Sequence, residues 1–222
     1  MIYKLVDVKE AENNLKDRLL HELESGKNVL WLVSGGSNIG VTVEIMRNIP
    51  EGLTEHLSIM LIDERYGKPG HADSNWQQLM QAGLSPKNAH LMPVLLSNSA
   101  LEQTAMHYNN MAAQAFAEAD VCIAQVGMGI DGHIAGILPH TVTSVDNQQL
   151  AVGYQNEPFD RLTLTFSALE MMDAIYVFAY GDSKREAITT LQNEGLSPDD
   201  QPAQFLKQLP EVYLYNDQIG DE

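Results

Sequence analysis

Residues 29–37, VLWLVSGGS, decide the fold class of this chain. Five consecutive apolar residues are typical of a strand that is buried on both faces of a sheet. The serines and glycines that follow at once are typical of a turn into a helix, so the stretch predicts the start of a strand–helix–strand unit. Similar short apolar runs, which we expect to be strands, occur at residues 3–6, 58–62, 121–126, 162–166, 175–180 and 212–215.

Helical patterns separate most of these runs. Because strands separated by helices need crossover connections, we predict an α/β fold. Its core would be a mostly parallel twisted sheet with helices on both faces, Rossmann-like, in a single domain over residues 1–222. The short link between residues 161–166 and 174–180 predicts either an antiparallel pairing or a brief helix. The helical positions that we expect in the core include Leu15, Leu19, Leu20 and Leu23, and Met106, Met111 and Phe116.

The composition of the 222 residues is ordinary, but the charge is not. A hydrophobic share of 44% supports a sizeable core and excludes a disordered, collagenous or coiled-coil chain. Thirty acidic against 13 basic side chains leave a formal net charge of −17. A field of that sign repels polyphosphates, so we expect neither nucleic acid nor an anionic membrane as a partner.

One cysteine, Cys122, lies in an apolar run, where we expect a buried structural thiol and no disulfide. The longest apolar run, residues 174–180, is far shorter than the roughly 18 residues that a membrane-spanning helix needs. The first residues carry charges where a signal peptide would be apolar. We therefore expect a cytoplasmic protein, and its oligomeric state is left open.

Four of the predicted strands run directly into loops of glycine and polar residues. These loops are residues 34–40, 63–66, 127–133 and 181–184. In open α/β sheets, ligands bind beyond the carboxyl ends of the strands. We therefore expect the four loops to face one cleft.

Gly35, Gly36 and Ser37 form a glycine-rich turn between a strand and a helix. Backbone amides at such a turn approach an anion closely and the helix N-terminus favours negative charge, so a phosphate fits here. An ordinary turn with Ser37 as a helix cap is the alternative. Lys184 lies in a second turn of this kind, where a cation is unfavourable unless an anion shares the site. A solvated surface lysine is the alternative.

Asp63, Glu64 and Arg65 follow another predicted strand. Because neighbouring strand residues point to opposite faces, we expect only one of the two carboxylates to line the cleft. The other would pair with an arginine or cap a backbone group. Arg65 can hold a phosphate or carboxylate with two parallel hydrogen bonds. Further on, Ser74 is expected to cap a helix.

Asp131 and His133 lie in a glycine-rich loop and carry the most chemistry. Histidine exchanges protons near neutral pH and a nearby carboxylate fixes its tautomer, so His133 is a candidate general base. A histidine that only ties down the loop is the alternative. His71, His140 and Asp63 could meet this pair in space, but no two of these residues have the helical spacing of zinc signatures. We expect no metal and no cofactor.

Taken in this order, the motifs resemble the 6-phosphogluconolactonase family, within the superfamily shared with glucosamine-6-phosphate isomerases/deaminases. The resemblance covers residues 29–205, and its specificity comes from the order, because each motif alone is weak. The motifs are VSGGS at residues 33–37, IDER at 62–65 with DSN at 73–75, GMGIDGH at 127–133, RLTLT at 161–165 and GDSK at 181–184.

The resemblance implies hydrolysis of 6-phospho-D-glucono-1,5-lactone to 6-phosphogluconate, the second step of the oxidative pentose phosphate pathway, without a cofactor. His133 would act as general base on the attacking water, and Asp131 would orient the imidazole or bind substrate hydroxyls. The residues implied in substrate and phosphate binding are Gly35, Gly36, Ser37, Asp63 and Lys184, with Arg161 or Arg65.

Several residues depart from the family's pattern. Asn38 and Ile39 stand where Thr-Pro is usual, and Gly136 replaces a serine. The deaminase relatives carry a glutamate where this chain has Leu138, and Asp-Glu-Tyr where it has residues 63–65, which favours the lactonase. The alternatives are a deaminase/isomerase that releases ammonia from glucosamine 6-phosphate, and a non-catalytic sugar-phosphate sensor.

Some of the scarce basic residues lie in or beside three of these motifs. We expect this positive charge to gather at one cleft, so that a small sugar phosphate meets a basic pocket within an acidic shell. The basic residues concerned are Arg65, Lys68, Arg161, Lys184 and Arg185.

Overall fold

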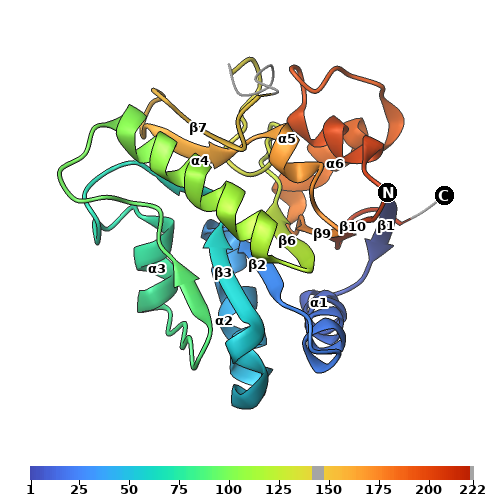
Figure 1. Ribbon diagram of the computed structural model, residues 1–222. Coiled ribbons are helices and arrows are strands. Elements are labelled where there is room, and N and C mark those ends of the chain that lie inside the picture. The colour runs from blue at the N-terminus through green and yellow to red at the C-terminus, as the bar shows by residue number, and fades with distance from the viewer. Residues whose placement is uncertain (142–147, 221–222) are drawn as a thin grey trace.

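The computed structural model of the chain describes residues 1–141 and 148–220 (Figure 1). Strands and helices alternate along most of the chain, as the apolar runs predicted. The strands are β1 (Ile2–Leu5), β2 (Val29–Val33), β3 (Leu57–Leu61), β4 (Asp63–Arg65), β5 (His90–Met92), β6 (Val121–Gly127), β7 (Ala151–Tyr154), β8 (Arg161–Leu164), β9 (Ala174–Phe178) and β10 (Val212–Asn216). The α-helices are α1 (Val8–Glu24), α2 (Ile39–Asn48), α3 (Asn75–Gln81), α4 (Leu101–Glu118), α5 (Phe166–Leu169) and α6 (Arg185–Asn193). The 3-10 helices are η1 (Gly36–Asn38), η2 (Glu51–His56), η4 (Asp182–Lys184) and η5 (Pro202–Gln208).

Seven strands form one sheet in the order β1-β10-β9-β6-β2-β3-β5, and each pairing in it is parallel. The predicted α/β fold with a mostly parallel sheet is confirmed. The chain runs from β2 outward to β3 and β5 and then returns to place β6 on the other side of β2. Connections that leave in opposite directions open a crevice at the carboxyl ends of the two central strands. The expected cleft therefore lies beyond the ends of β2 and β6.

Helices cover both faces of this sheet, as predicted. α1 packs against α2 and contacts β2, β9 and β10, and α4 crosses the opposite face (Figure 1). Leu15, Leu19 and Leu23 of α1 are fully buried, which confirms the helical pattern there. Among the described residues, no helix is long and apolar enough to span a membrane.

The predicted core face of α4 is wrong at one position. Met106 is 62% exposed, whereas Tyr108 and Phe116 are buried. Met106 precedes Tyr108 by two residues, which is a rotation of about 200° around the helix, so Met106 lies on the side opposite to buried Tyr108. The buried side of α4 is formed by Thr104, Tyr108, Ala112, Ala115 and Phe116.

A second sheet, antiparallel and in the order β4-β8-β7, is a feature that the sequence patterns did not predict. The apolar run at 162–166 was expected to be a strand, but β8 ends at Leu164. The brief helix α5 follows and leads to β9, so the helical alternative for this link is confirmed. The small sheet places β4 and β8 beside the cleft of the large one.

Cys122 lies in β6 as a buried free thiol. Burial raises the pKa of the Cys122 thiol to about 12. A thiol that stays protonated is a poor nucleophile, so Cys122 has the structural role that the sequence predicted.

Candidate active site

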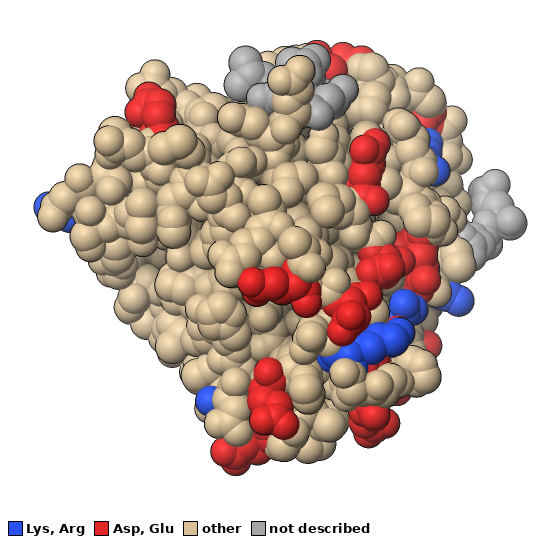
Figure 2. Space-filling view, viewed as in Figure 1, with Lys and Arg blue, Asp and Glu red and all other residues tan. Residues whose placement is uncertain are grey.

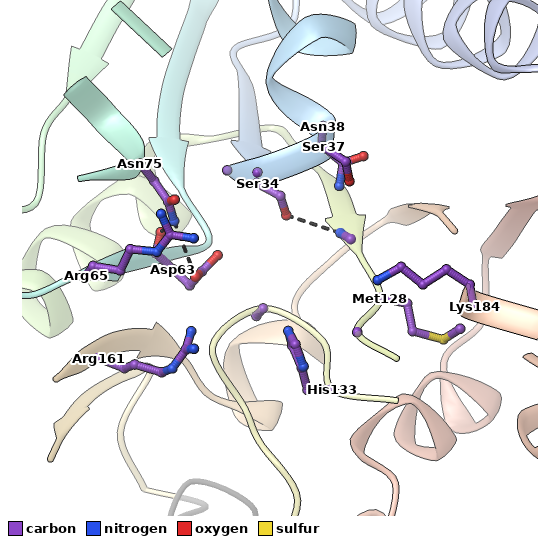
Figure 3. Close-up of a pocket in the computed structure, with 15 residues that line it drawn as sticks. Ser34, Ser37, Asn38, Asp63, Arg65, Asn75, Met128, His133, Arg161 and Lys184 are labelled. Carbon is purple, nitrogen blue, oxygen red and sulfur yellow. Dashed lines mark hydrogen bonds between the residues drawn. The ribbon is translucent and has the colours of Figure 1, made fainter. Parts of the chain in front are cut away.

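The four predicted loops meet at one hollow of about 240 Å³ beyond the carboxyl ends of β2 and β6 (Figure 3). The predicted residues that line it are Gly35, Gly36, Ser37, Asp63, Arg65, His133, Arg161 and Lys184. Asp131 is the remaining predicted residue, and it contacts His133 instead of lining the hollow.

His133 and Asp131 form a close pair. Nδ1 of His133 lies 2.6 Å from Oδ1 of Asp131, which also accepts the backbone N–H of His133 at 3.1 Å. Burial alone would raise the pKa of Asp131, but the hydrogen bonds and charge of His133 outweigh it and lower this pKa to about 2. Because Nδ1 donates to a carboxylate, Nε2 is the ring nitrogen that can accept a proton. The pair therefore has the arrangement of a general base with its orienting group.

Gly129 makes room for this pair. A Cβ at Gly129 would lie 2.0 Å from Nδ1 of His133 and 2.4 Å from Oδ1 of Asp131. The backbone N–H of Gly129 also donates to the carbonyl oxygen of His133 at 2.8 Å, which closes the loop. Glycine is thus the residue that lets the loop fold tightly enough to bring carboxylate and imidazole together.

Gly35, Gly36 and Ser37 form the turn between β2 and α2, as predicted. Gly36 has a φ of 61°, a conformation that favours glycine. A Cβ at Gly35 would lie 2.0 Å from Oδ1 of Asn75. Neither η1 nor α2 has a side-chain cap, so the alternative of a Ser37 cap is wrong. The leading amides of these helices are therefore available to an anion.

Asp63 is the carboxylate that lines the hollow, and Glu64 turns away from it, as the strand geometry predicted. Nδ2 of Asn75 donates to the carbonyl oxygen of Asp63 at 3.0 Å and to its Oδ2 at 3.3 Å. Burial raises the pKa of Asp63, and the charges of Arg161 and Arg65 oppose this rise. The hollow therefore holds one buried acid among its cations.

Glu64 is fully buried and holds the start of α3. Its carboxylate accepts the backbone N–H groups of Asn75 and Trp76, at 2.7 and 3.1 Å, and the hydroxyl of Ser74 at 2.8 Å. Ser74 in turn caps α3 by accepting the N–H of Gln77 at 3.1 Å. Both expected capping roles are confirmed.

Arg65 and Arg161 lie directly opposite each other in the pairing of β4 with β8. Like charges that face each other across two strands destabilise a sheet, so an anion at this wall of the hollow would relieve their repulsion. Arg65 is held in place: its Nη1 donates to the carbonyl oxygen of Asp73 at 3.0 Å, and its guanidinium lies 5.6 Å from the ring centre of Phe159.

Lys184 approaches the hollow from the opposite side to Arg65 and Arg161, with His133 between them (Figure 3). Burial lowers the pKa of Lys184, and the charge of Asp131 opposes this effect. A partly desolvated ammonium group attracts an anion more strongly than an exposed one, because water screens it less. Lys184 lines the hollow and is only partly exposed, and its role in binding an anion stays a prediction.

The positive charge gathers at the hollow only in part. Arg65, Arg161 and Lys184 line it, but Lys68 and Arg185 do not. Arg185 lies 3.6 Å from Asp182 in an exposed ion pair. On the face shown in Figure 2, acidic side chains are scattered widely and basic ones are few. A basic pocket within an acidic surface is the arrangement that we expected.

Three polar residues that line the hollow were not predicted as site residues. Asn38 and Asn75 are 2% and 1% exposed, and their carboxamides lie at its upper wall in Figure 3. Ser34 donates to the carbonyl oxygen of Gln125 at 3.0 Å and accepts the N–H of Gly127 at 3.3 Å, so it joins the ends of β2 and β6. Ser34 and Asn75 lie inside sequence motifs and Asn38 directly follows one, and this position is the signal by which the three residues could be found.

Gly136, the departure from the family's serine, fits the space behind the hollow. Its N–H donates to Oγ1 of Thr163 at 2.9 Å, and its carbonyl oxygen accepts the hydroxyl of Tyr154 at 2.5 Å. A Cβ here would lie 2.8 Å from Cβ of Thr163 and 3.2 Å from Cβ of Asp63. Thr163 thus fills the space that the side chain of a serine at position 136 would need.

A family profile described as "Glucosamine-6-phosphate isomerases/6-phosphogluconolactonase" matches residues 7–214. The chain belongs to this family. The 6-phosphogluconolactonase of Synechocystis sp. is 29% identical over 180 residues, which cover 75% of this chain and 73% of the relative.

Two further matches show how much the family has in common. The glucosamine-6-phosphate deaminase of Streptococcus thermophilus is 26% identical over 218 residues, which cover 91% of this chain and 90% of the relative. The crystal structure of a 6-phosphogluconolactonase from Shewanella baltica superposes with a TM-score of 0.81 at 22% identity, over 97% of each chain. This structural likeness confirms the fold.

Proposed function

We propose that this protein hydrolyses 6-phospho-D-glucono-1,5-lactone to 6-phosphogluconate, a step of the oxidative pentose phosphate pathway. The observation that carries the proposal is the pair of His133 and Asp131, with Nδ1 and Oδ1 2.6 Å apart, at a hollow that also holds three cationic side chains. A base supplies the proton transfer that attack by water needs, and cations bind an anionic substrate. The lactonase relatives support the same activity.

In the proposed reaction, Nε2 of His133 takes a proton from a water molecule whose oxygen attacks the lactone carbonyl carbon. The tetrahedral intermediate collapses by breaking the bond from this carbon to the ring oxygen. His133 returns the proton to that oxygen, which becomes a hydroxyl of the open-chain acid. General base catalysis contributes about 10²–10⁴-fold. A lactone is already reactive in water, so no covalent nucleophile is required.

The phosphate of the substrate would bind the backbone amides of Gly35, Gly36 and Ser37 together with Lys184. Arg65 and Arg161 place positive charge on the other wall (Figure 3). Charge on both walls suits a substrate that carries a phosphate at one end and develops an oxyanion at the other.

A glucosamine-6-phosphate deaminase is the second candidate, because the deaminase of Streptococcus thermophilus is similar over most of the chain. That reaction opens a sugar ring and moves a proton between two carbons before ammonia leaves, so it needs more acid–base groups than a lactonase. Leu138 stands where the resemblance implies a glutamate in deaminases. The lactonase is therefore the better supported activity.

Two substrates tested side by side decide between these activities. Opening of the phosphorylated lactone is followed by proton release and corrected for the spontaneous reaction, and ammonia is measured with glucosamine 6-phosphate. We expect accelerated lactone opening, a much slower reaction with unphosphorylated gluconolactone, and no ammonia. Ammonia release without lactone opening would establish the deaminase. Binding of 6-phosphogluconate without turnover of either substrate would establish a sensor.

Two expectations from the sequence, one domain over residues 1–222 and a cytoplasmic location, stay predictions. Limited proteolysis tests the first, because a single domain resists cleavage until it unfolds as a whole. Fractionation of cells that produce the protein tests the second.

A further inference from the structure

Gln201 is a buried glutamine that lies outside the hollow, directly before η5. Its Nε2 donates to the carbonyl oxygen of Ala187 at 2.9 Å, and its Oε1 accepts Nε2 of Gln204 at 2.7 Å. Ala187 lies in the first turn of α6, and Lys184 immediately precedes this helix. One amide of Gln201 thus fixes the end of the helix that presents a cation to the hollow.

The other side of Gln201 supports the loop of the general base. Gly132, between Asp131 and His133, has a φ of 76°, and a Cβ there would lie 2.3 Å from Cγ of Gln201. The aliphatic part of Gln201 therefore fills the place of a side chain at Gly132. The carbonyl oxygen of Gly132 also accepts the backbone N–H of Ala203 at 2.9 Å. The loop rests on the segment that Gln201 begins.

We propose that Gln201 is a positioning residue that sets the spacing between His133 and Lys184. Its aliphatic part packs against the loop that contains His133. Its amide donates to Ala187 in the helix that follows Lys184. An apolar side chain of similar length would fill the same volume but leave the carbonyl of Ala187 without this donor, so α6 could shift relative to the loop. This inference rests on the proposed function, in which His133 acts on one end of a substrate whose phosphate Lys184 holds.

Gln201→Met tests the proposal, because methionine has a similar length and makes no hydrogen bond to Ala187. We expect kcat/KM for the phosphorylated lactone to fall about tenfold, since a displacement of about 1 Å between reacting groups costs up to 10²-fold. Gln192→Met is the control: Gln192 lies in the last turn of the same helix as Ala187, is partly buried, and donates to the carbonyl oxygen of Gly220 at 3.2 Å instead of to Ala187. We expect a similar melting temperature for both variants and a kcat/KM within about threefold of wild type for the control.

A double-mutant cycle separates positioning from a general structural role. If Gln201 acts through the placement of Lys184, its substitution matters little once Lys184 is gone. In a Lys184→Met background we therefore expect Gln201→Met to lower kcat/KM by about twofold instead of tenfold. Equal losses in both backgrounds, or an unchanged kcat/KM for Gln201→Met alone, would overturn the proposal.

A milder substitution at Gln201 and a binding measurement distinguish failure of the positioning role from failure of the proposed lactonase activity. If Gln201→Met does not fold, Gln201→Asn takes its place in the cycle, because it shortens the same side chain by one methylene and pulls its amide away from Ala187. A wild type that shows no lactone turnover overturns the proposed function. The cycle is then measured on the affinity for 6-phosphogluconate by calorimetry, where additive effects still refute the positioning role.

Discussion

Two histidines that lie close together in the sequence, His133 and His140, each pair with an aspartate, and of these two pairs only the first faces the hollow. Nδ1 of His133 is 2.6 Å from Asp131, and Nδ1 of His140 is 3.1 Å from Asp199. The side chain of His133 is 31% exposed and that of His140 is 67% exposed. The residue types are the same, so the difference between the pairs lies in what surrounds them.

The surroundings give the pairs different roles. His140 joins two loops, because its backbone N–H also donates to the carbonyl oxygen of Asp199 at 2.9 Å. His133 instead lies between Lys184 and the two arginines of the hollow (Figure 3). A base is useful only where a substrate can be held within reach of it. We therefore assign chemistry to the first pair and a structural tie to the second.

The largest difference should appear when each histidine is removed. His133→Ala removes the general base, so we expect kcat for the phosphorylated lactone to fall by about 10²–10⁴-fold. His140→Ala removes an exposed contact, so we expect kcat within about twofold of wild type. Rapid proton-release assays on folded variants measure both. Equal losses, or a full rate in His133→Ala, would remove the distinction between the pairs.

The second largest difference should appear between a cation that lines the hollow and one that lies away from it. Arg161→Gln takes one charge from the hollow, and a hydrogen bond to a charged group contributes about 1.5–3 kcal/mol, so we expect KM to rise about tenfold or more. Arg47→Gln is the control, because the Arg47 side chain is 60% exposed and pairs with Glu44 away from the hollow. Steady-state kinetics on the two variants check this. A similar KM in both would mean that Arg161 does not touch the substrate.

The alkaline pH dependence of binding is a smaller effect. Because burial lowers the pKa of Lys184, its ammonium group loses its charge below the ordinary lysine pKa of 10.5. Affinity for 6-phosphogluconate should therefore weaken as the pH rises toward 10.5, and Lys184→Arg should retain it to higher pH. Calorimetry across this range tests the expectation. Identical profiles for the two proteins would exclude Lys184 from phosphate binding.

The smallest effect is that of salt on the overall field. A protein of net charge −17 repels an anionic substrate at long range, and the local cations act only nearby. Adding salt from very low ionic strength should therefore raise kcat/KM, by about twofold, as the repulsion is screened. A steady fall in kcat/KM over the same range would show that the field of the hollow dominates the approach of the substrate.

The sequence predicted the parts of the fold that rest on long apolar runs. All residues of β2 and all but the last residue of β6 are buried, and apolar runs of this kind are stable only when they pair inside a sheet. The small sheet escaped prediction because β4 consists of Asp63, Glu64 and Arg65, which have no apolar period to reveal a strand. Such short polar strands form only because a partner strand is brought beside them by the rest of the fold.

The candidate site was predictable wherever its chemistry followed a strand end. Asp131 and His133 could be found in this way, because a turn of glycines and titratable groups at the carboxyl edge points to a ligand. The pairing of Arg65 with Arg161 could not, since it depends on the register of two strands distant in sequence. Gln201 was also beyond reach, because its role depends on the empty Cβ position of Gly132.

The most direct test of the catalytic pair leaves both histidines in place and changes their carboxylates. Asp131→Asn keeps the shape of the loop, but its amide can donate to Nδ1 and so favours the tautomer in which Nε2 carries the proton. We predict that Asp131→Asn lowers kcat for lactone hydrolysis by at least about 10²-fold, and that Asp199→Asn leaves it unchanged. Equal rates for the two variants would contradict the assignment of His133 and Asp131 as the catalytic pair.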